Sequence, residues 1–143
     1  MPSRAASRVP DHRRYPQAMG PKILVVDDDP VIVRLLEVNF RLEGFDVMTA
    51  GRGQDAIALA TESPPDIILL DVMMPGLDGY EVYRQMRQIP QLAQTPVFFL
   101  SARAKDEDRA RGLESGVVEY VTKPFDPSGL VALVRQRLEG TVS

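Results

Sequence analysis

Acidic, hydroxyl and amine side chains follow several apolar runs of this sequence, and they are its candidates for chemistry. Each comes directly after a run of strand length, and the set consists of Asp27, Asp28, Asp71, Ser101 and Lys123. Carboxylates brought together repel one another unless a cation lies among them, and a ligand set made of oxygen alone suits Mg²⁺. With such a cation in place, one carboxylate can attack phosphorus and become an acyl phosphate. The residue types therefore predict Mg²⁺-assisted phosphoryl chemistry, in which the lysine and the hydroxyl contact the phosphoryl oxygens.

The composition disfavours several other kinds of site. The sequence has no cysteine, which excludes disulfides and thiolate nucleophiles, and its one histidine, His12, lies in an arginine-rich segment. A histidine-ligated metal and a Ser-His-Asp triad are therefore poor interpretations. No apolar run approaches the roughly 18–20 residues that cross a bilayer, and residues 1–20 lack the apolar stretch of a secretory signal. We therefore expect a cytoplasmic protein without membrane insertion.

The 143 residues suffice for one domain, which we place at 22–139, after a leader at 1–21 and before a tail at 140–143. The leader holds four arginines against Asp11, a net charge of +3, which leaves −6 for the rest of a chain whose total is −3. Its polar composition without periodicity predicts disorder. We interpret it either as a basic docking arm or as a dispensable extension, with Met19 as the true start. The acidic remainder argues against direct binding of nucleic acid.

The chemical residues need a scaffold that brings them together, and the apolar pattern predicts a sheet. Uninterrupted apolar runs predict buried strands at 23–26, 67–70 and 97–100, with weaker strands at 46–50 and 119–122. Amphipathic segments between them predict helices at 31–42, 54–61, 80–88, 107–115 and 128–138. This alternation predicts an α/β fold with a doubly wound, five-stranded parallel sheet flanked by five helices. In such sheets, ligands lie beyond the carboxyl ends of the strands.

Asp29 lies beside the acidic pair, but we expect it to have a structural role. Pro30 is favoured at the first position of a helix, which makes Asp29 the natural N-cap. Capping does not explain Asp27 and Asp28, so these two acids stay candidates for the site.

Four blocks of the sequence resemble the characteristic blocks of response-regulator receiver domains, the phosphoacceptor modules of two-component signalling. The blocks are 22–28, 67–79, 98–102 and 120–125, and they occur in the order and spacing of that family. The resemblance covers residues 22–138 and implies the flavodoxin-like fold of a single-domain receiver similar to the chemotaxis regulators.

The resemblance implies a role for each acidic residue. Asp71 is the implied phosphoacceptor, and Asp27 and Asp28 are the implied acidic pair. The implied cofactor is Mg²⁺, for which Asp28, Asp71 and the backbone carbonyl of Met73 are the direct ligands, with Asp27 beside them.

The resemblance also names the residues that transmit the signal. Ser101 and Lys123 contact the phosphoryl group, Tyr120 is the aromatic switch that moves with Ser101, and the peptide bond before Pro124 is cis. Tyr120 then changes the face formed by the predicted elements at 107–115, 119–122 and 128–138. The alternative for Tyr120 is an ordinary surface aromatic.

Some positions differ from common members of the family. Met73 and Arg103 lie where other members often place polar groups that orient water for dephosphorylation, so we expect slow loss of phosphate. The stretches at 116–120 and 129–133 lack charges that DNA-binding members use for dimers, so we expect a monomer or a weak dimer.

These features predict a phosphorylation-dependent signalling switch rather than an enzyme. Its partners are a sensor histidine kinase or phosphotransfer protein as phosphodonor and a downstream effector protein. Only five residues follow Leu138, which predicts no output domain unless the chain is the receiver fragment of a longer DNA-binding response regulator. Two less favoured interpretations are a phosphatase of the haloacid-dehalogenase kind, with Asp27 and Asp29 as its pair, and a receiver that takes no phosphate.

Overall fold

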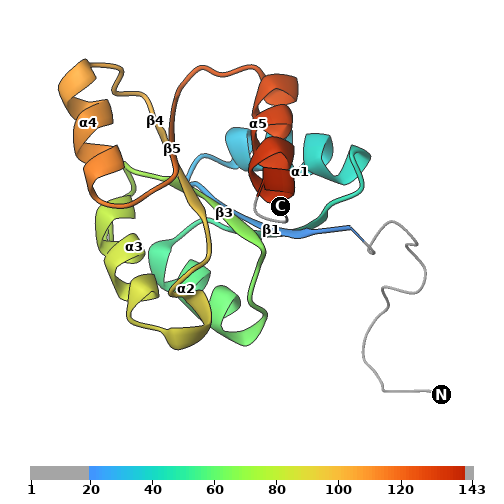
Figure 1. Ribbon diagram of the computed structural model, residues 1–143, viewed down its shortest axis with the longest axis horizontal. Coiled ribbons are helices and arrows are strands. Elements are labelled where there is room, and N and C mark those ends of the chain that lie inside the picture. The colour runs from blue at the N-terminus through green and yellow to red at the C-terminus, as the bar shows by residue number, and fades with distance from the viewer. Residues whose placement is uncertain (1–19, 141–143) are drawn as a thin grey trace.

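Five parallel strands form one sheet in the order β2-β1-β3-β4-β5. The computed structural model describes residues 20–140 of the chain. The strands are β1 (Lys22–Val26), β2 (Asp46–Ala50), β3 (Ile67–Asp71), β4 (Val97–Ser101) and β5 (Glu119–Thr122). The helices are α1 (Pro30–Leu42), α2 (Gly53–Glu62), α3 (Gly79–Arg87), the 3-10 helix η3 (Pro90–Leu92), α4 (Asp106–Glu114) and α5 (Pro127–Gly140). The predicted doubly wound α/β fold is confirmed (Figure 1).

The sheet separates two apolar clusters. α1 and α5 cover one face of the sheet, and α2, α3 and α4 cover the other (Figure 1). In β1, Ile23 and Val25 belong to the cluster under α1 and α5, whereas Leu24 and Val26 belong to the opposite cluster. All four side chains are 0% exposed, which explains why the sequence of this strand is apolar without interruption.

Local capping places the loops at the carboxyl edge of the sheet. The Asp29 side chain accepts a hydrogen bond of 2.9 Å from the Val31 amide, which confirms Asp29 as the N-cap of α1. Asp78 caps α3 in the same way, through the amide of Glu81 at 2.9 Å. Both helices therefore start close to the strand ends that precede them.

The predicted boundaries agree with the structure to within a few residues. Asp71 and Ser101 are the last residues of β3 and β4, one position beyond the predicted strand ends. η3 was not predicted, because three residues are too few to show a periodic pattern. The predicted leader at 1–21 and tail at 140–143 lie largely outside the described residues and stay predictions. None of the helices within 20–140 has the length and apolar character needed to span a membrane.

Candidate phosphoacceptor site

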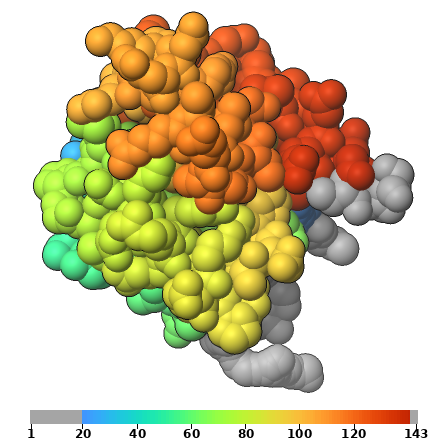
Figure 2. All heavy atoms as spheres, turned by 60° about the vertical axis from the view of Figure 1, so that its left-hand side comes forward, coloured from blue at the N-terminus to red at the C-terminus, as the bar shows by residue number. Residues whose placement is uncertain are grey.

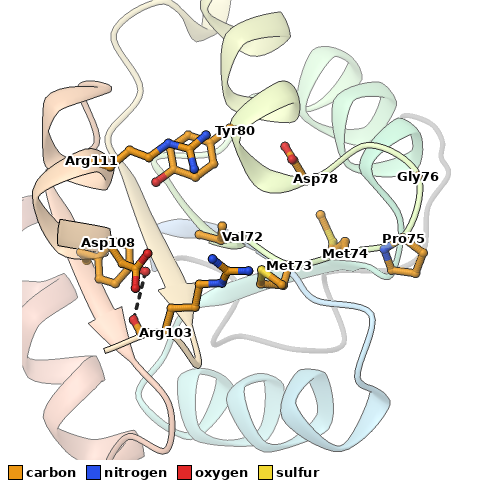
Figure 3. A pocket seen from close by; sticks show the side chains of 11 residues that line it. Val72, Met73, Met74, Pro75, Gly76, Asp78, Tyr80, Arg103, Asp108 and Arg111 are labelled. Carbon is orange, nitrogen blue, oxygen red and sulfur yellow. Dashed lines mark hydrogen bonds between the residues drawn. The ribbon is translucent and has the colours of Figure 1, made fainter. Parts of the chain in front are cut away.

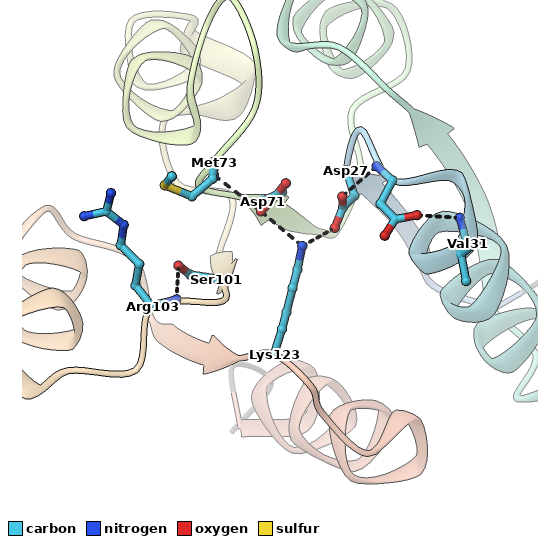
Figure 4. Close-up of polar contacts among 8 residues, drawn as sticks. Asp27, Val31, Asp71, Met73, Ser101, Arg103 and Lys123 are labelled. Atoms are coloured by element: carbon cyan, nitrogen blue, oxygen red, sulfur yellow. Dashed lines mark hydrogen bonds and ion pairs between the residues drawn. The ribbon is translucent and has the colours of Figure 1, made fainter.

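The candidate residues lie together at the carboxyl edge of the sheet (Figure 4). Val26 pairs with Leu70 in the register of β1 and β3, so Asp27 and Asp71 follow at neighbouring strand ends. Ser101 ends β4, and Lys123 follows directly after β5. The sheet topology therefore brings together side chains that are far apart in the sequence.

Lys123 joins the two buried carboxylates of this edge. Its Nζ lies 2.8 Å from Asp27 Oδ2 and 3.3 Å from Asp71 Oδ1. The side chains of Asp27 and Asp71 are 0% and 4% exposed, whereas the Lys123 side chain is 19% exposed. Each acid also accepts a backbone hydrogen bond, Asp27 from the Asp29 amide at 2.9 Å and Asp71 from the Met73 amide at 3.4 Å. One lysine thus partly neutralises two acids that are almost completely shielded from solvent.

The pKa values show that one lysine is not enough for two carboxylates. Burial, followed by repulsion from Asp27, raises the pKa of Asp71 from 3.8 to about 7, although Lys123 opposes the shift. Burial also acts to lower the pKa of Lys123, but its hydrogen bonds and ion pairs with Asp27 and Asp71 outweigh burial and raise that pKa. The site therefore favours added positive charge near Asp71.

The oxygen atoms fit a hard divalent cation. One carboxylate oxygen each of Asp27, Asp28 and Asp71 lies within 4.8 Å of the others. Asp27 Oδ2 is buried, and its close partner among the described residues is Lys123 Nζ at 2.8 Å. Asp28 is exposed, which leaves one side open for water and for a phosphoryl group. An oxygen-only set of this kind suits Mg²⁺ better than a transition metal.

Ser101 and Tyr120 are connected through the backbone of a single loop residue. The Arg103 amide donates a hydrogen bond of 3.0 Å to Ser101 Oγ, and the Tyr120 hydroxyl donates one of 3.1 Å to the Arg103 carbonyl. Tyr120 is only 2% exposed, so the alternative of a surface aromatic is wrong. The peptide bond between Lys123 and Pro124 is cis, as the family resemblance implies.

A pocket of about 580 Å³ opens beside Asp71, between the β3–α3 loop and α4 (Figure 3). Met73, which is 50% exposed, and Arg103 line it on the side nearest Asp71. Farther from the site, the Arg111 guanidinium lies over the Tyr80 ring, 4.2 Å from its centroid. This contact between α3 and α4 was not predicted, because an exposed arginine in a sequence does not reveal its partner.

Gly79 is a second residue that the sequence analysis did not assign. A Cβ at this position would lie 2.5 Å from the Asp71 carbonyl oxygen and 2.7 Å from Val72 Cα, distances that real Cβ contacts do not show. Glycine therefore lets the start of α3 approach the backbone at the end of β3. The Asp78-Gly79 pair at a predicted helix start was the available signal.

Comparison with known proteins identifies the class of this fold and site. Residues 23–135 match the family model of the response regulator receiver domain. The chain belongs to this family, and it is a receiver domain of the two-component type.

Individual relatives agree with this assignment. The chain is 46% identical over 117 residues to the alkaline phosphatase synthesis transcriptional regulatory protein PhoP of Bacillus subtilis, and the match covers 82% of the chain and 48% of PhoP. The chain therefore spans about half the length of this curated relative.

Solved structures agree as well. The receiver domain of the Francisella response regulator 1452 aligns with a TM-score of 0.79 at 37% identity, covering 85% of this chain and 99% of that one. The chemotaxis protein CheY4 of Vibrio cholerae aligns with a TM-score of 0.77 at 30% identity, covering 81% and 97%. Receiver domains generally bind Mg²⁺ at a cluster of aspartates, and the cluster of Asp27, Asp28 and Asp71 is of that kind.

Proposed function

We propose that Asp71 accepts a phosphoryl group from a histidine kinase or phosphotransfer protein and that the modified domain then binds a downstream effector protein. The observation that carries the proposal is the environment of Asp71, a buried carboxylate that lies against Lys123 and has an oxygen within 4.8 Å of one oxygen each of Asp27 and Asp28. A partly compensated negative charge of this kind is suited to attack on phosphorus once a cation is added.

In this mechanism an Asp71 oxygen forms a bond to phosphorus while the bond from phosphorus to the donor imidazole breaks, and the imidazole leaves with a proton. Asp28, Asp71 and the Met73 carbonyl would hold Mg²⁺, with Asp27 beside them, and Mg²⁺ would neutralise the incoming phosphoryl oxygens. Lys123 exchanges its contact with Asp71 for a phosphoryl oxygen, and the Ser101 hydroxyl donates to another.

Phosphate uptake from acetyl phosphate with Mg²⁺ tests the acceptor. We expect the wild type and the control Asp55→Asn, which changes an exposed acid of α2, to gain one phosphoryl group by intact mass. Asp71→Asn should gain none. Equal uptake by Asp71→Asn, or no uptake by the wild type, would contradict the proposal.

The lifetime of the phosphate is part of the proposal. Met73 offers a thioether and Arg103 a guanidinium at the two positions beside the acceptor, and neither is a suitable base for orienting an attacking water. We expect slow dephosphorylation, with Met73→Asn shortening the half-life. A wild-type half-life of seconds in the presence of Mg²⁺ would contradict this expectation.

An apolar stripe on α1 is the proposed docking surface for the phosphodonor. Val31, Leu35, Val38 and Leu42 lie on one side of the helix and are 72%, 37%, 39% and 79% exposed. α1 starts directly after the acidic pair, so a donor helix packed along this stripe reaches toward Asp71.

Variants of the stripe separate docking from chemistry. Val31→Glu should slow phosphotransfer from a purified histidine kinase that phosphorylates the wild type, without changing uptake from acetyl phosphate. Leu113→Glu, at a residue of α4 that is 43% exposed, is the matched control and should leave both rates unchanged. Unchanged kinase transfer to Val31→Glu would exclude this surface.

A second candidate concerns the whole protein. The name of the Bacillus subtilis relative describes a transcriptional regulator, and that relative is about twice as long as the matched region. This favours the alternative in which the domain is the receiver of a DNA-binding response regulator, with the effector in the same polypeptide. The intact mass of the natural gene product distinguishes this arrangement from a stand-alone receiver.

The aspartyl phosphatase is not supported as an alternative. Its second acid would be Asp29, whose side chain accepts from the Val31 amide as the cap of α1. A cytoplasmic location and a monomeric or weakly dimeric state complete the proposal, and light scattering of the purified protein measures the latter.

A further inference from the structure

The only buried residue among those of α4 is a glycine. The other side chains of this helix are exposed or partly exposed, and Gly112 is the position at which α4 meets the sheet. Figure 2 shows α4 at the edge of the molecule with α3 beside it. Since α4 contributes no large buried side chain, its distance from β5 depends on what Gly112 contacts.

Gly112 contacts the ring of Tyr120. A Cβ at Gly112 would lie 2.4 Å from Tyr120 Cδ2 and 2.9 Å from Cε2, and real Cβ contacts essentially never fall below 3.0 Å. These ring atoms belong to a rigid, buried group, so the overlap cannot be relieved by moving the end of a flexible side chain. Only a glycine permits this ring position and this helix position together.

A neighbouring residue on the same side of α4 contacts Tyr120 as well. Arg109, three residues before Gly112, donates a hydrogen bond of 2.6 Å from Nη1 to the Tyr120 carbonyl. At the other end of the ring, the Tyr120 hydroxyl contacts the Arg103 carbonyl, and the Arg103 amide contacts Ser101. Tyr120 thus links the loop that follows Ser101 to the face of α4 that carries Gly112.

We propose that Gly112 is a positioning residue for signal output, because its missing side chain creates the space that holds the Tyr120 ring inward and sets the position of α4. The inference rests on the proposed function, since it concerns how phosphorylation of Asp71 changes the α4 face. With any larger residue at 112, Tyr120 leaves its place and the connection from Ser101 to α4 is broken, while the acceptor site stays intact.

The sign of a stability change distinguishes this role from that of an ordinary helical glycine. Alanine is the better helix former, so Gly→Ala in a helix without a steric conflict stabilises a protein. We expect Gly112→Ala to lower the Tm by about 4–8 °C, because overpacking outweighs the gain in helix propensity. Gly129→Ala in α5, where the nearest atom to a Cβ would lie 3.4 Å away, is the control and should not lower the Tm.

A double variant keeps the test decisive if Gly112→Ala folds poorly. When the ring is removed by Tyr120→Ala, the nearest remaining atom to a Cβ at 112 is Phe99 Cδ2 at 3.5 Å, an ordinary contact. In that background, Gly112→Ala should raise the Tm by about 2–4 °C. If Gly112→Ala changes the Tm in the same direction in the wild type and in Tyr120→Ala, the inference is overturned.

NMR with beryllofluoride and Mg²⁺ tests the signalling part. In the wild type we expect shifts at the amides around Asp71 and along α4, and in Gly112→Ala we expect the first set with the α4 set lost. Equal α4 shifts in Gly112→Ala would overturn the role of Gly112 and leave the acceptor proposal standing. The absence of any shift around Asp71 in the wild type would instead contradict the acceptor proposal.

Discussion

The acidic site and the contact between α4 and β5 are held together by different interactions. At the site, Asp27 and Asp71 are buried and Lys123 is partly buried, and burial followed by repulsion from Asp27 raises the pKa of Asp71 to about 7. At the α4 contact, a glycine fits against the Tyr120 ring, and Arg109 adds a partly buried hydrogen bond to the Tyr120 carbonyl. The site should therefore respond to added charge, and the α4 contact to changes of shape.

The largest expected effect comes from removing the positive charge of the Lys123 side chain. Lys123→Met leaves Asp27 and Asp71 buried without a counter-charge, which costs about 3–5 kcal/mol when one partner of a buried pair is lost. We expect urea unfolding to show this loss without Mg²⁺ and a partial recovery with it. Lys105→Met, at an exposed position before α4, is the control. Equal stability of the Lys123 and Lys105 variants would show that the site is not held by charge.

A smaller effect of opposite sign is expected from Asp71→Asn. Because folding raises the pKa of Asp71, the fold binds this proton more tightly than the unfolded chain does, and ionised Asp71 destabilises the fold. The gain from Asp71→Asn should be absent below pH 4, grow as the pH rises toward 7, and reach on the order of 1–3 kcal/mol at pH 8 without Mg²⁺. Unfolding free energies of the wild type and Asp71→Asn at pH 4 and pH 8 measure this gain. A larger gain at pH 4 than at pH 8 would contradict the expectation that ionised Asp71 destabilises the fold.

The smallest effect is expected at the α4 contact. Arg109→Ala removes a partly buried hydrogen bond to the Tyr120 carbonyl, which contributes about 1 kcal/mol. Hydrogen exchange should become faster in α4, while Mg²⁺ affinity stays unchanged. Glu114→Ala on the same helix is the control. A change of Mg²⁺ affinity in Arg109→Ala would mean that the two regions are coupled without phosphate.

Much of the fold and the acidic site could be predicted because their signals are local. The uninterrupted apolar run of β3 predicts a doubly buried strand, and the residue at its end, Asp71, must then lie at the carboxyl edge. Asp29 and Pro30 predict the start of α1 in the same local way. Three residues of η3 carry no comparable pattern, so that element was missed.

The parts that were not predicted depend on contacts between distant segments. Arg111 contacts Tyr80 without any signal in the sequence, and the Asp78-Gly79 pair indicates a helix start but not that Gly79 lies against the backbone of Asp71. Tyr120 was compatible with both a surface and a buried position until the structure placed its ring against α4.

The sequence by itself determined the order of strands and helices, the caps, and the identity of the acids at the strand ends, because each follows from the backbone preferences and apolar pattern of neighbouring residues. Only the tertiary structure decided that Lys123 lies between Asp27 and Asp71, since that distance depends on the strand order β1-β3-β4-β5. Tertiary structure also decided that Gly112 meets Tyr120, because close packing between a helix and a sheet depends on the shapes of both surfaces at once.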